Sequence, residues 1–149
     1  MTAEAPDISI RLLTPGDYDA VCELWRLAGL AVKLTGREAR EAFAAQLERF
    51  PTTYLGAEDG QRLVGVILGT HDHRKGWINR LAVHPQYRRR GVGLALLRAC
   101  ERALRDCGLE IIAAFIEDGN EPSRRLLERA GYLADVPVRY YRKRYRPDI

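Results

Sequence analysis

The chain has 149 residues, of which 46% are hydrophobic and 30% charged, a composition that predicts one globular domain with a buried core. Its 24 basic and 20 acidic residues leave a formal charge of +4, which suits a polyanionic small molecule and does not require nucleic acid. The polar start and the lack of about 18 consecutive apolar residues exclude any sign of export or of a membrane span. We therefore expect a cytoplasmic protein without membrane or nucleic-acid partners.

The first third of the chain predicts a strand followed by two helices. Residues 8–13 alternate between apolar and polar side chains, as a half-buried strand does. Thr14 is then a candidate N-cap, with Pro15 at the first helical position. The apolar face of this helix carries Val21, Leu24, Trp25 and Ala28, and Gly29 ends it.

A second helix is predicted over residues 37–50, where Pro51 ends it. Between the two helices, residues 30–36 form a connector.

Residues 53–57 and 62–70 predict a β-hairpin about the turn at residues 58–60. His71 and His73 follow and flank an aspartate, but the only other histidine, His84, gives too few ligands for a closed metal site. We expect no metal and place this polar turn at the surface or at the rim of a pocket.

The central stretch predicts a strand, a glycine-containing turn and a long helix. Residues 77–83 are rich in strand formers, and residues 92–107 carry the helical apolar period. Between them, Gly91 and Gly93 follow three arginines, at Arg88, Arg89 and Arg90. Such a turn aims backbone N–H groups and the positive end of a helix dipole at one point, where an anion such as pyrophosphate binds. The alternative is a basic surface turn that caps the helix.

The last third predicts a strand at residues 110–116, buried on both faces, a helix at 121–130 and a closing strand at 136–145. The closing strand mixes arginines with Tyr140, Tyr141 and Tyr145. That mixture is typical of single-stranded nucleic-acid binding, but in a closing strand it places tyrosines inside and arginines outside, which is the interpretation we favour.

Three cysteines, Cys22, Cys100 and Cys107, lack the spacing of metal ligands. Because Cys100 and Cys107 are seven residues apart on one helical face, we expect buried thiols.

Two segments together resemble a known family. Arg88-x-x-Gly91-x-Gly93, preceded by residues 81–85 (LAVHP), resembles the acyl-CoA signature of the GNAT superfamily of N-acyltransferases. Asn120 and Ser123, with Leu126 and the pair Gly131-Tyr132, are similar to the family's second conserved segment. The pattern is nearest to small bacterial members related to ribosomal-protein N-terminal alanine acetyltransferases.

The resemblance implies an α/β fold: a mixed, mostly antiparallel sheet flanked by helices, with strands 4 and 5 splayed to admit the cofactor. The implied order is strand, two helices, three strands, helix, strand, helix and two strands. One N-acetyltransferase domain would span residues 1–149, with its core at about 8–146.

The implied reaction is direct transfer of an acetyl group from acetyl-CoA, bound as co-substrate, to an amine. The residues that the resemblance assigns to binding of acetyl-CoA are Leu81, Ala82, Val83, Arg88, Arg89, Arg90, Gly91, Val92, Gly93, Leu94, Asn120 and Ser123. The backbone N–H near Val83 would polarise the thioester carbonyl.

Two catalytic roles lack a clear residue. The family often has a tyrosine as proton donor to the leaving thiolate where this chain has Leu127, so Tyr140 or Tyr141 is the candidate, or the thiolate leaves unaided. Glu117 and Asp118 are the nearest carboxylates for the base. The alternative, which we favour, is that both are solvated carboxylates of a turn.

Two functions follow: an N-acetyltransferase that acts on a small amine or a protein amino group, as a monomer or homodimer, or a catalytically weak acyl-CoA-binding module that acts as a sensor or scaffold.

Overall fold

The computed structural model describes residues 7–135 and 137–147. Its elements are β1 (Ile8–Leu12), the 3₁₀ turn η1 (Pro15–Asp17), α1 (Tyr18–Leu27), α2 (Arg40–Arg49), β2 (Tyr54–Asp59), β3 (Arg62–His71), β4 (Gly76–Val83), the 3₁₀ turn η2 (Pro85–Tyr87), α3 (Val92–Asp106), β5 (Ile112–Ala113) and α4 (Glu121–Arg129). No helix of the described part is long and apolar enough to cross a membrane.

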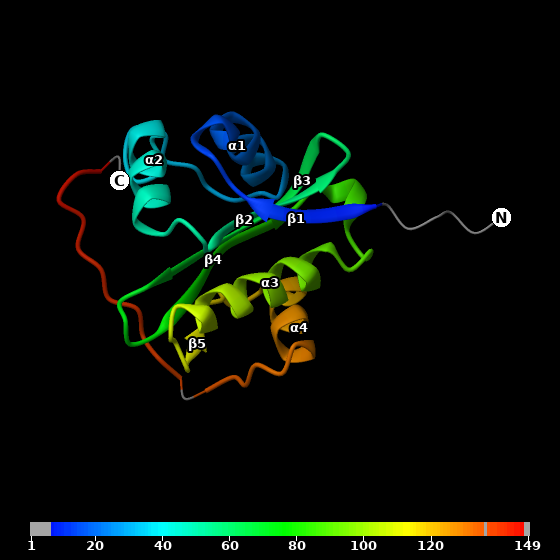
Figure 1. Ribbon diagram of the computed structural model, residues 1–149. Helices are drawn as coiled ribbons and strands as arrows, with labels where there is room; N and C mark the ends of the chain where they lie inside the picture. The colour runs from blue at the N-terminus through cyan, green and yellow to red at the C-terminus, as the bar shows by residue number, and fades with distance from the viewer. Residues whose placement is uncertain (1–6, 136, 148–149) are drawn as a thin grey trace.

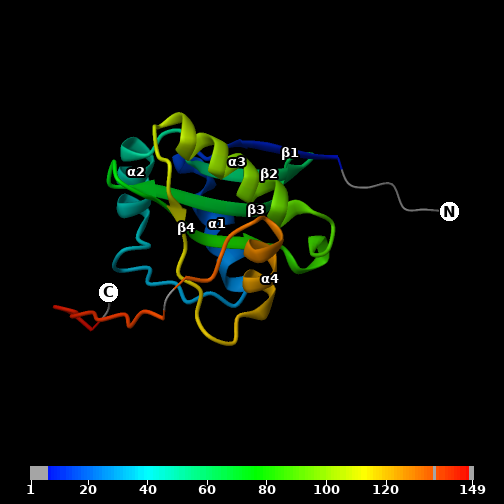
Figure 2. The same cartoon turned by 90° about the horizontal axis from the view of Figure 1, so that it is seen from below.

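The five strands form one sheet in the order β1-β2-β3-β4-β5. The first four pair antiparallel, and β5 pairs parallel with β4. Helices α1 and α2 cover one face of this sheet, whereas α3 and α4 cover the other (Figure 1; Figure 2 shows α3 and α4 from below). The predicted mixed α/β fold is confirmed.

Each face of the sheet has its own apolar core. On one face, the predicted side chains Val21, Leu24 and Trp25 of α1 are at most 2% exposed and pack with residues of α2 and β3. On the other face, the inner side of α3 is fully buried at Leu96, Leu97, Cys100 and Leu104. Burial of this apolar surface is the main force that holds the two helical layers on the sheet.

Strands β4 and β5 part soon after they meet. They pair only at Gly76 with Ile112 and at Trp77 with Ala113. Among the residues that the structure describes, the rest of β4 therefore has no paired strand on that side. The predicted splay between strands 4 and 5 is confirmed. It leaves backbone groups of β4 available to a ligand instead of to a ladder.

A β-bulge interrupts the part of β4 that has separated from β5. Val66 faces Ala82, whereas Leu68 faces Asn79, so β4 has one more residue than β3 between these pairs. Arg80, at this irregularity, has a φ of +51°, a left-handed conformation that a non-glycine residue adopts rarely. As a result, the consecutive side chains of Asn79 and Arg80 both line a cavity on the α1–α2 side.

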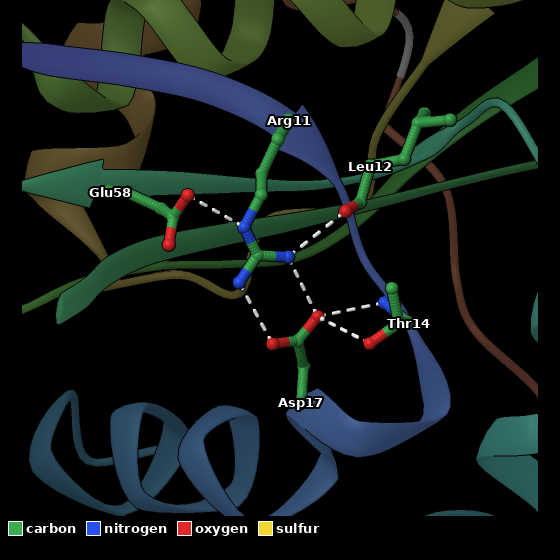
Figure 3. Close-up of polar contacts among 5 residues, drawn as sticks. All are labelled: Arg11, Leu12, Thr14, Asp17 and Glu58. Carbon is green, nitrogen blue, oxygen red and sulfur yellow. Dashed lines mark hydrogen bonds and ion pairs between the residues drawn. The ribbon is translucent and has the colours of Figure 1, made fainter. Parts of the chain in front are cut away.

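An ionic network fastens the start of α1 to the sheet (Figure 3). Arg11 of β1 bonds both carboxylate oxygens of Asp17, at 2.8 and 2.9 Å, and contacts Glu58 of β2 at 2.8 Å. The same Asp17 carboxylate accepts the Thr14 N–H at 2.7 Å. Hydrogen bonds from the Arg11 guanidinium hold the pKa of Asp17 below its ordinary value. Thr14, the predicted N-cap of the first helix, is the N-cap of the 3₁₀ turn η1, and the N-cap of α1 itself is Asp17.

The second helix is shorter than predicted at its start. It begins at Arg40 and ends at Arg49, so that Arg37 and Glu38 belong to the loop after α1. Glu38 is drawn out of the helix because its carboxylate bonds the Lys33 N–H at 3.0 Å and ion-pairs with Arg37.

The last part of the chain departs most from the prediction. Val136 lies outside the described residues, and residues 137–147 form no strand. Strand β5 itself is only two residues long, and the prediction that it is buried on both faces is wrong, because Ile111 and Phe115 are 54% and 65% exposed. Since β5 is so short, it offers no ladder along which the C-terminal segment could pair.

The tyrosines of this segment are therefore outside the core. Tyr140, Tyr141 and Tyr145 are 72–84% exposed, which overturns the expectation that they point inward. Cys107 is likewise exposed, although Cys100 is fully buried as predicted. Helix α3 ends at Asp106, so Cys107 is its C-cap and lies beyond the buried face of the helix. Gly108, with a φ of +94°, then turns the chain.

Candidate active site

The turn before α3 has the geometry of an anion site. Gly91 is the N-cap of α3 and has a φ of +79°, which favours glycine over every other residue. The first helical hydrogen bond described here runs from the Ala95 N–H to the Gly91 carbonyl, at 3.0 Å. The N–H groups of Val92, Gly93 and Leu94 lie in the first turn, where a helix provides no acceptors for them. They are free to bind a phosphate.

The second glycine of the turn has a packing role. A Cβ at Gly93 would lie 3.3 Å from Leu126 of α4 and 3.7 Å from Val83 of β4. Gly93 thus lets α4 approach the start of α3 and the open end of β4. This packing role adds to the binding of acetyl-CoA that the resemblance implies for Gly93.

Three arginines surround the turn with positive charge. Arg88, Arg89 and Arg90 are all exposed, and Arg90 lies over the ring of Tyr87, 5.3 Å from its centroid. Arg89 has a φ of +62°. The guanidinium groups are therefore presented to solvent around the free N–H groups, where a polyanion could meet them.

Val83 directs its backbone into the opening between β4 and β5. The N–H of the next residue, His84, donates to Val64 of β3 at 2.8 Å. Because backbone groups of successive strand residues point to opposite edges, the Val83 N–H points away from β3, toward the side that β5 has left. The side chain of Ala82 lies in the α1–α2 core, whereas Leu81 and Val83 pack on the α3 side.

Asn120 begins α4, as predicted. Its side-chain oxygen accepts the Ser123 N–H at 3.4 Å, which is the bond of an N-cap. The contact between Gly93 and Leu126 packs α4 against the start of α3.

A cavity of about 430 Å³ lies on the α1–α2 face of the sheet. Its lining is drawn from α1, the following loop, α2 and three strands: Trp25, Arg37, Glu38, Phe43, Gln46, Tyr54, Leu68, Thr70, Asn79 and Arg80. Trp25, Phe43 and Tyr54 are buried aromatics, so the floor of this cavity is apolar. Burial raises the pKa of Tyr54 to about 12, so its hydroxyl stays protonated at neutral pH.

The polar end of the cavity is built around Glu38, whose side chain is 8% exposed. One carboxylate oxygen accepts the Lys33 N–H, and the other contacts Arg37 at 3.1 Å and Arg80 at 3.7 Å. Arg80 also donates to the Ala31 carbonyl at 2.7 Å. Sequence reasoning missed Glu38, Tyr54 and Arg80, because they lie far apart in the chain.

The histidines form no metal site in the described part of the chain, which contains no group of three or more potential ligands. His71 accepts the His73 N–H and packs against the ring of Phe50.

A family model, the acetyltransferase (GNAT) family, matches residues 18–132. The chain belongs to the GNAT acetyltransferase family. The match covers α1 to the end of α4 and so includes both the turn before α3 and the lining of the cavity. Membership confirms the prediction of an acetyltransferase that uses acetyl-CoA.

GNAT relatives are found by sequence and by structure. An acetyltransferase of Photorhabdus laumondii is 28% identical over 125 residues, which are 84% of this chain and 86% of that protein. The PaiA N-acetyltransferase of Thermoplasma acidophilum, solved with coenzyme A, is 19% identical with a TM-score of 0.77, over 87% of this chain and 91% of that chain. The ribosomal-protein-alanine N-acetyltransferase of Brucella melitensis is 19% identical with a TM-score of 0.69. The match covers 91% of this chain and 99% of that chain.

The chain departs from the GNAT pattern at Leu127, which is half-buried and packs against the core under α3. Tyr132 is no substitute, because its hydroxyl donates to Glu101 at 2.9 Å. Tyr140 lies beside Phe115, with 6.1 Å between ring centroids, and Phe115 stacks on Trp77 at 5.1 Å. Because Trp77 is the last residue of β4 that pairs with β5, this aromatic row links Tyr140 to the point where the strands part.

The candidate carboxylates of the base are less closely connected to the site. Glu117 and Asp118 are exposed in the turn between β5 and α4. Tyr141 is 84% exposed. Of the residues predicted for catalysis, only Val83 and Tyr140 are therefore tied to the opening by a described contact or backbone direction.

Proposed function

We propose that this GNAT protein transfers an acetyl group from acetyl-CoA to an amine by direct attack in a ternary complex. The observation that carries the proposal is the opening between β4 and β5, with an anion-binding turn beside it and an aromatic cavity on the α1–α2 face. Two substrates can thus approach one point from two directions, as direct transfer requires.

The turn and the start of α4 fit the donor substrate. The first-turn N–H groups of α3 would hold the pyrophosphate, with the exposed side chains of Arg88, Arg89 and Arg90 as counter-charges. Leu81, Ala82 and Val83 would offer backbone groups to the pantetheine arm, and Asn120 and Ser123 would approach it from α4. The coenzyme A bound by the related PaiA N-acetyltransferase agrees with this assignment.

The reaction then needs few protein groups. The neutral amine attacks the thioester carbonyl, whose developing negative charge the Val83 N–H stabilises. A C–N bond forms, the C–S bond breaks, and the sulfur leaves as a thiolate. The attacking nitrogen loses its proton to Glu117 through water, and the thiolate gains a proton from Tyr140.

The test is release of thiol from acetyl-CoA with a panel of amines. We expect amine-dependent release, and a peptide with an N-terminal alanine belongs in the panel because of the ribosomal-protein-alanine relative. Tyr140→Phe should lower kcat, whereas the neighbouring control Tyr141→Phe should not.

A second candidate, a weakly catalytic acyl-CoA-binding module, rests on Leu127 at the position of the usual proton donor. It predicts tight binding of acetyl-CoA with no thiol release for any amine, and restoration of turnover by Leu127→Tyr.

A further inference from the structure

The charges that line the cavity are unequal. Two cationic side chains, Arg37 and Arg80, stand against one carboxylate, that of Glu38. Both oxygens of this carboxylate already have partners, in the Lys33 N–H and the two guanidinium groups. Glu38 is therefore not available to bind a cationic substrate, and the cavity keeps an excess of positive charge.

Hydrogen-bond donors are also in excess over acceptors at this side of the cavity. The guanidinium of Arg80 lies over the ring of Trp25, 4.4 Å from its centroid. Within the described part of the chain, Arg80 Nε and Trp25 Nε1 are buried without a hydrogen-bond partner. Both atoms are donors only, and a buried donor without an acceptor is costly. Two buried donors at this side of the cavity therefore remain without an acceptor among the described residues.

Asn79, next to Arg80 in β4, offers a place for an amine. The Asn79 amide nitrogen donates to Thr70 Oγ1 at 3.0 Å and to the Trp77 carbonyl at 3.3 Å. This orientation leaves the amide oxygen as an acceptor. Asn79 and Thr70 line the cavity on strands β3 and β4, and Trp77 marks where β4 and β5 part.

We propose that the amine acceptor carries a carboxylate, held by Arg80 and Arg37 while its amine lies by Asn79 toward the opening. A carboxylate supplies acceptor oxygens and the compensating negative charge, whereas a polycation would meet like charge in an apolar setting. The volume of about 430 Å³ suits an amino acid or the first residues of a peptide. This inference rests on the proposed function and names its acceptor class.

The test uses the full-length protein and matched acceptors. Peptides with one sequence but aspartate or asparagine at the second position differ near the amine mainly in charge. A peptide with lysine there places a positive charge in the same region, and mass spectrometry shows which of its two amines is acetylated. Free glutamate and its diamide make the same comparison without a peptide, and spermidine serves as the polycation. We expect kcat/KM, measured by thiol release, to be at least about tenfold higher for each carboxylate than for its amide, and lowest for lysine and spermidine.

Variants locate the effect in the cavity. Arg80→Gln should raise KM for the carboxylate acceptors at least about tenfold, and leave KM for acetyl-CoA unchanged. Because Arg80 is partly buried beside Glu38, this variant could fail to fold; Arg37→Gln, with a side chain 59% exposed, tests the same preference in a folded protein. Arg49→Gln, an exposed arginine of α2 outside the cavity lining, is the matched control and should change nothing.

The outcomes separate the two proposals. Turnover that is fastest with lysine peptides or spermidine would overturn the carboxylate inference and leave the proposed function standing. Absence of thiol release with every amine would overturn the proposed function. In that case, calorimetric binding of the carboxylate and amide peptides to the coenzyme A complex still decides the inference: equal affinities would overturn it.

Discussion

The two sides of the opening differ in how they are built. The proposed donor side consists mainly of one continuous stretch, residues 81–94, to which α4 adds Asn120 and Ser123. This stretch offers backbone N–H groups at the start of α3, where Gly91 has a positive φ. The acceptor side gathers side chains from six elements or loops, from Trp25 to Arg80. A site made from backbone recognises what all donors share, whereas one made from scattered side chains can change its substrate without changing the fold.

The acceptor side should depend more on distant anchors, and Asp17→Asn is the strongest way to show this. The variant loses the charged bonds to Arg11 and should lower the free energy of unfolding by about 1.5–3 kcal/mol at pH 7. KM for the amine should rise while the affinity for acetyl-CoA is kept. Urea unfolding and calorimetry measure the two effects.

The effect should also depend on pH. Because the pKa of Asp17 is lowered in the folded protein, its contribution is complete above its unfolded pKa of about 3.9 and is lost as the pH falls through the folded value. The difference in stability between wild type and variant should therefore narrow in acid. Glu23→Gln, which breaks an exposed ion pair of α1, is the control and should change the free energy of unfolding much less than Asp17→Asn does. An equal loss in both variants would contradict the anchoring role.

Gly91→Val tests the donor side. Valine resists a φ of +79°, so the first-turn N–H groups of α3 should lose their alignment, and affinity for acetyl-CoA should fall at least about tenfold, or about 1.4 kcal/mol. Gly108→Val is the matched control, because Gly108 also has a positive φ and open space but lies beyond the other end of α3. If calorimetry finds unchanged affinity in Gly91→Val, the phosphate assignment is wrong.

Asn120→Ala should have a smaller effect, since it removes one N-cap bond. We expect a loss of about 1 kcal/mol in stability, together with weaker binding of acetyl-CoA and unchanged KM for the amine. Thermal unfolding and calorimetry provide the measurements. A variant that lost all turnover with wild-type melting and affinity would instead indicate a chemical role for Asn120.

Removal of the cysteines should have the smallest effect on the reaction. Burial raises the pKa of Cys100 to about 12 and raises that of Cys22 as well, so neither is a ready nucleophile. A variant with all three cysteines replaced by alanine should keep its rate apart from packing losses at Cys100. Initial-rate plots for the two substrates should intersect, whereas parallel plots with an acetylated cysteine peptide would show a covalent intermediate.

Local patterns predicted local structure well. The strand, turn and helix around Gly91 follow from a strand pattern, a positive-φ glycine and a 3.6-residue period within one stretch, and each was predicted within a residue or two. The start of α4 at Glu121 agrees with the predicted helix for the same reason.

The predictions that were wrong concern positions that depend on contacts between distant parts of the chain. The alternation after Val136 shows which residues could share a strand face, but it cannot supply a neighbouring strand, and β5 is too short to be one. Glu38 lies outside its predicted helix, because its carboxylate contacts residues of a loop and of β4. Arg80 faces the cavity because of a bulge that no local sequence pattern indicates. Such positions are set by tertiary contacts, which periodicity does not contain.

The bulge at Arg80 also makes β4 sensitive to chain length. Deletion of Arg80 would restore regular pairing between β3 and β4, because it removes the extra residue between Asn79 and Ala82. Either Asn79 would then turn its side chain away from the cavity, or the side chains of Leu81 and Val83 would leave the face they share with α3. The number of residues in this part of β4 thus decides which side chains face the cavity and which face α3. We therefore expect an insertion or deletion here to reduce acetyl transfer more than a point substitution does.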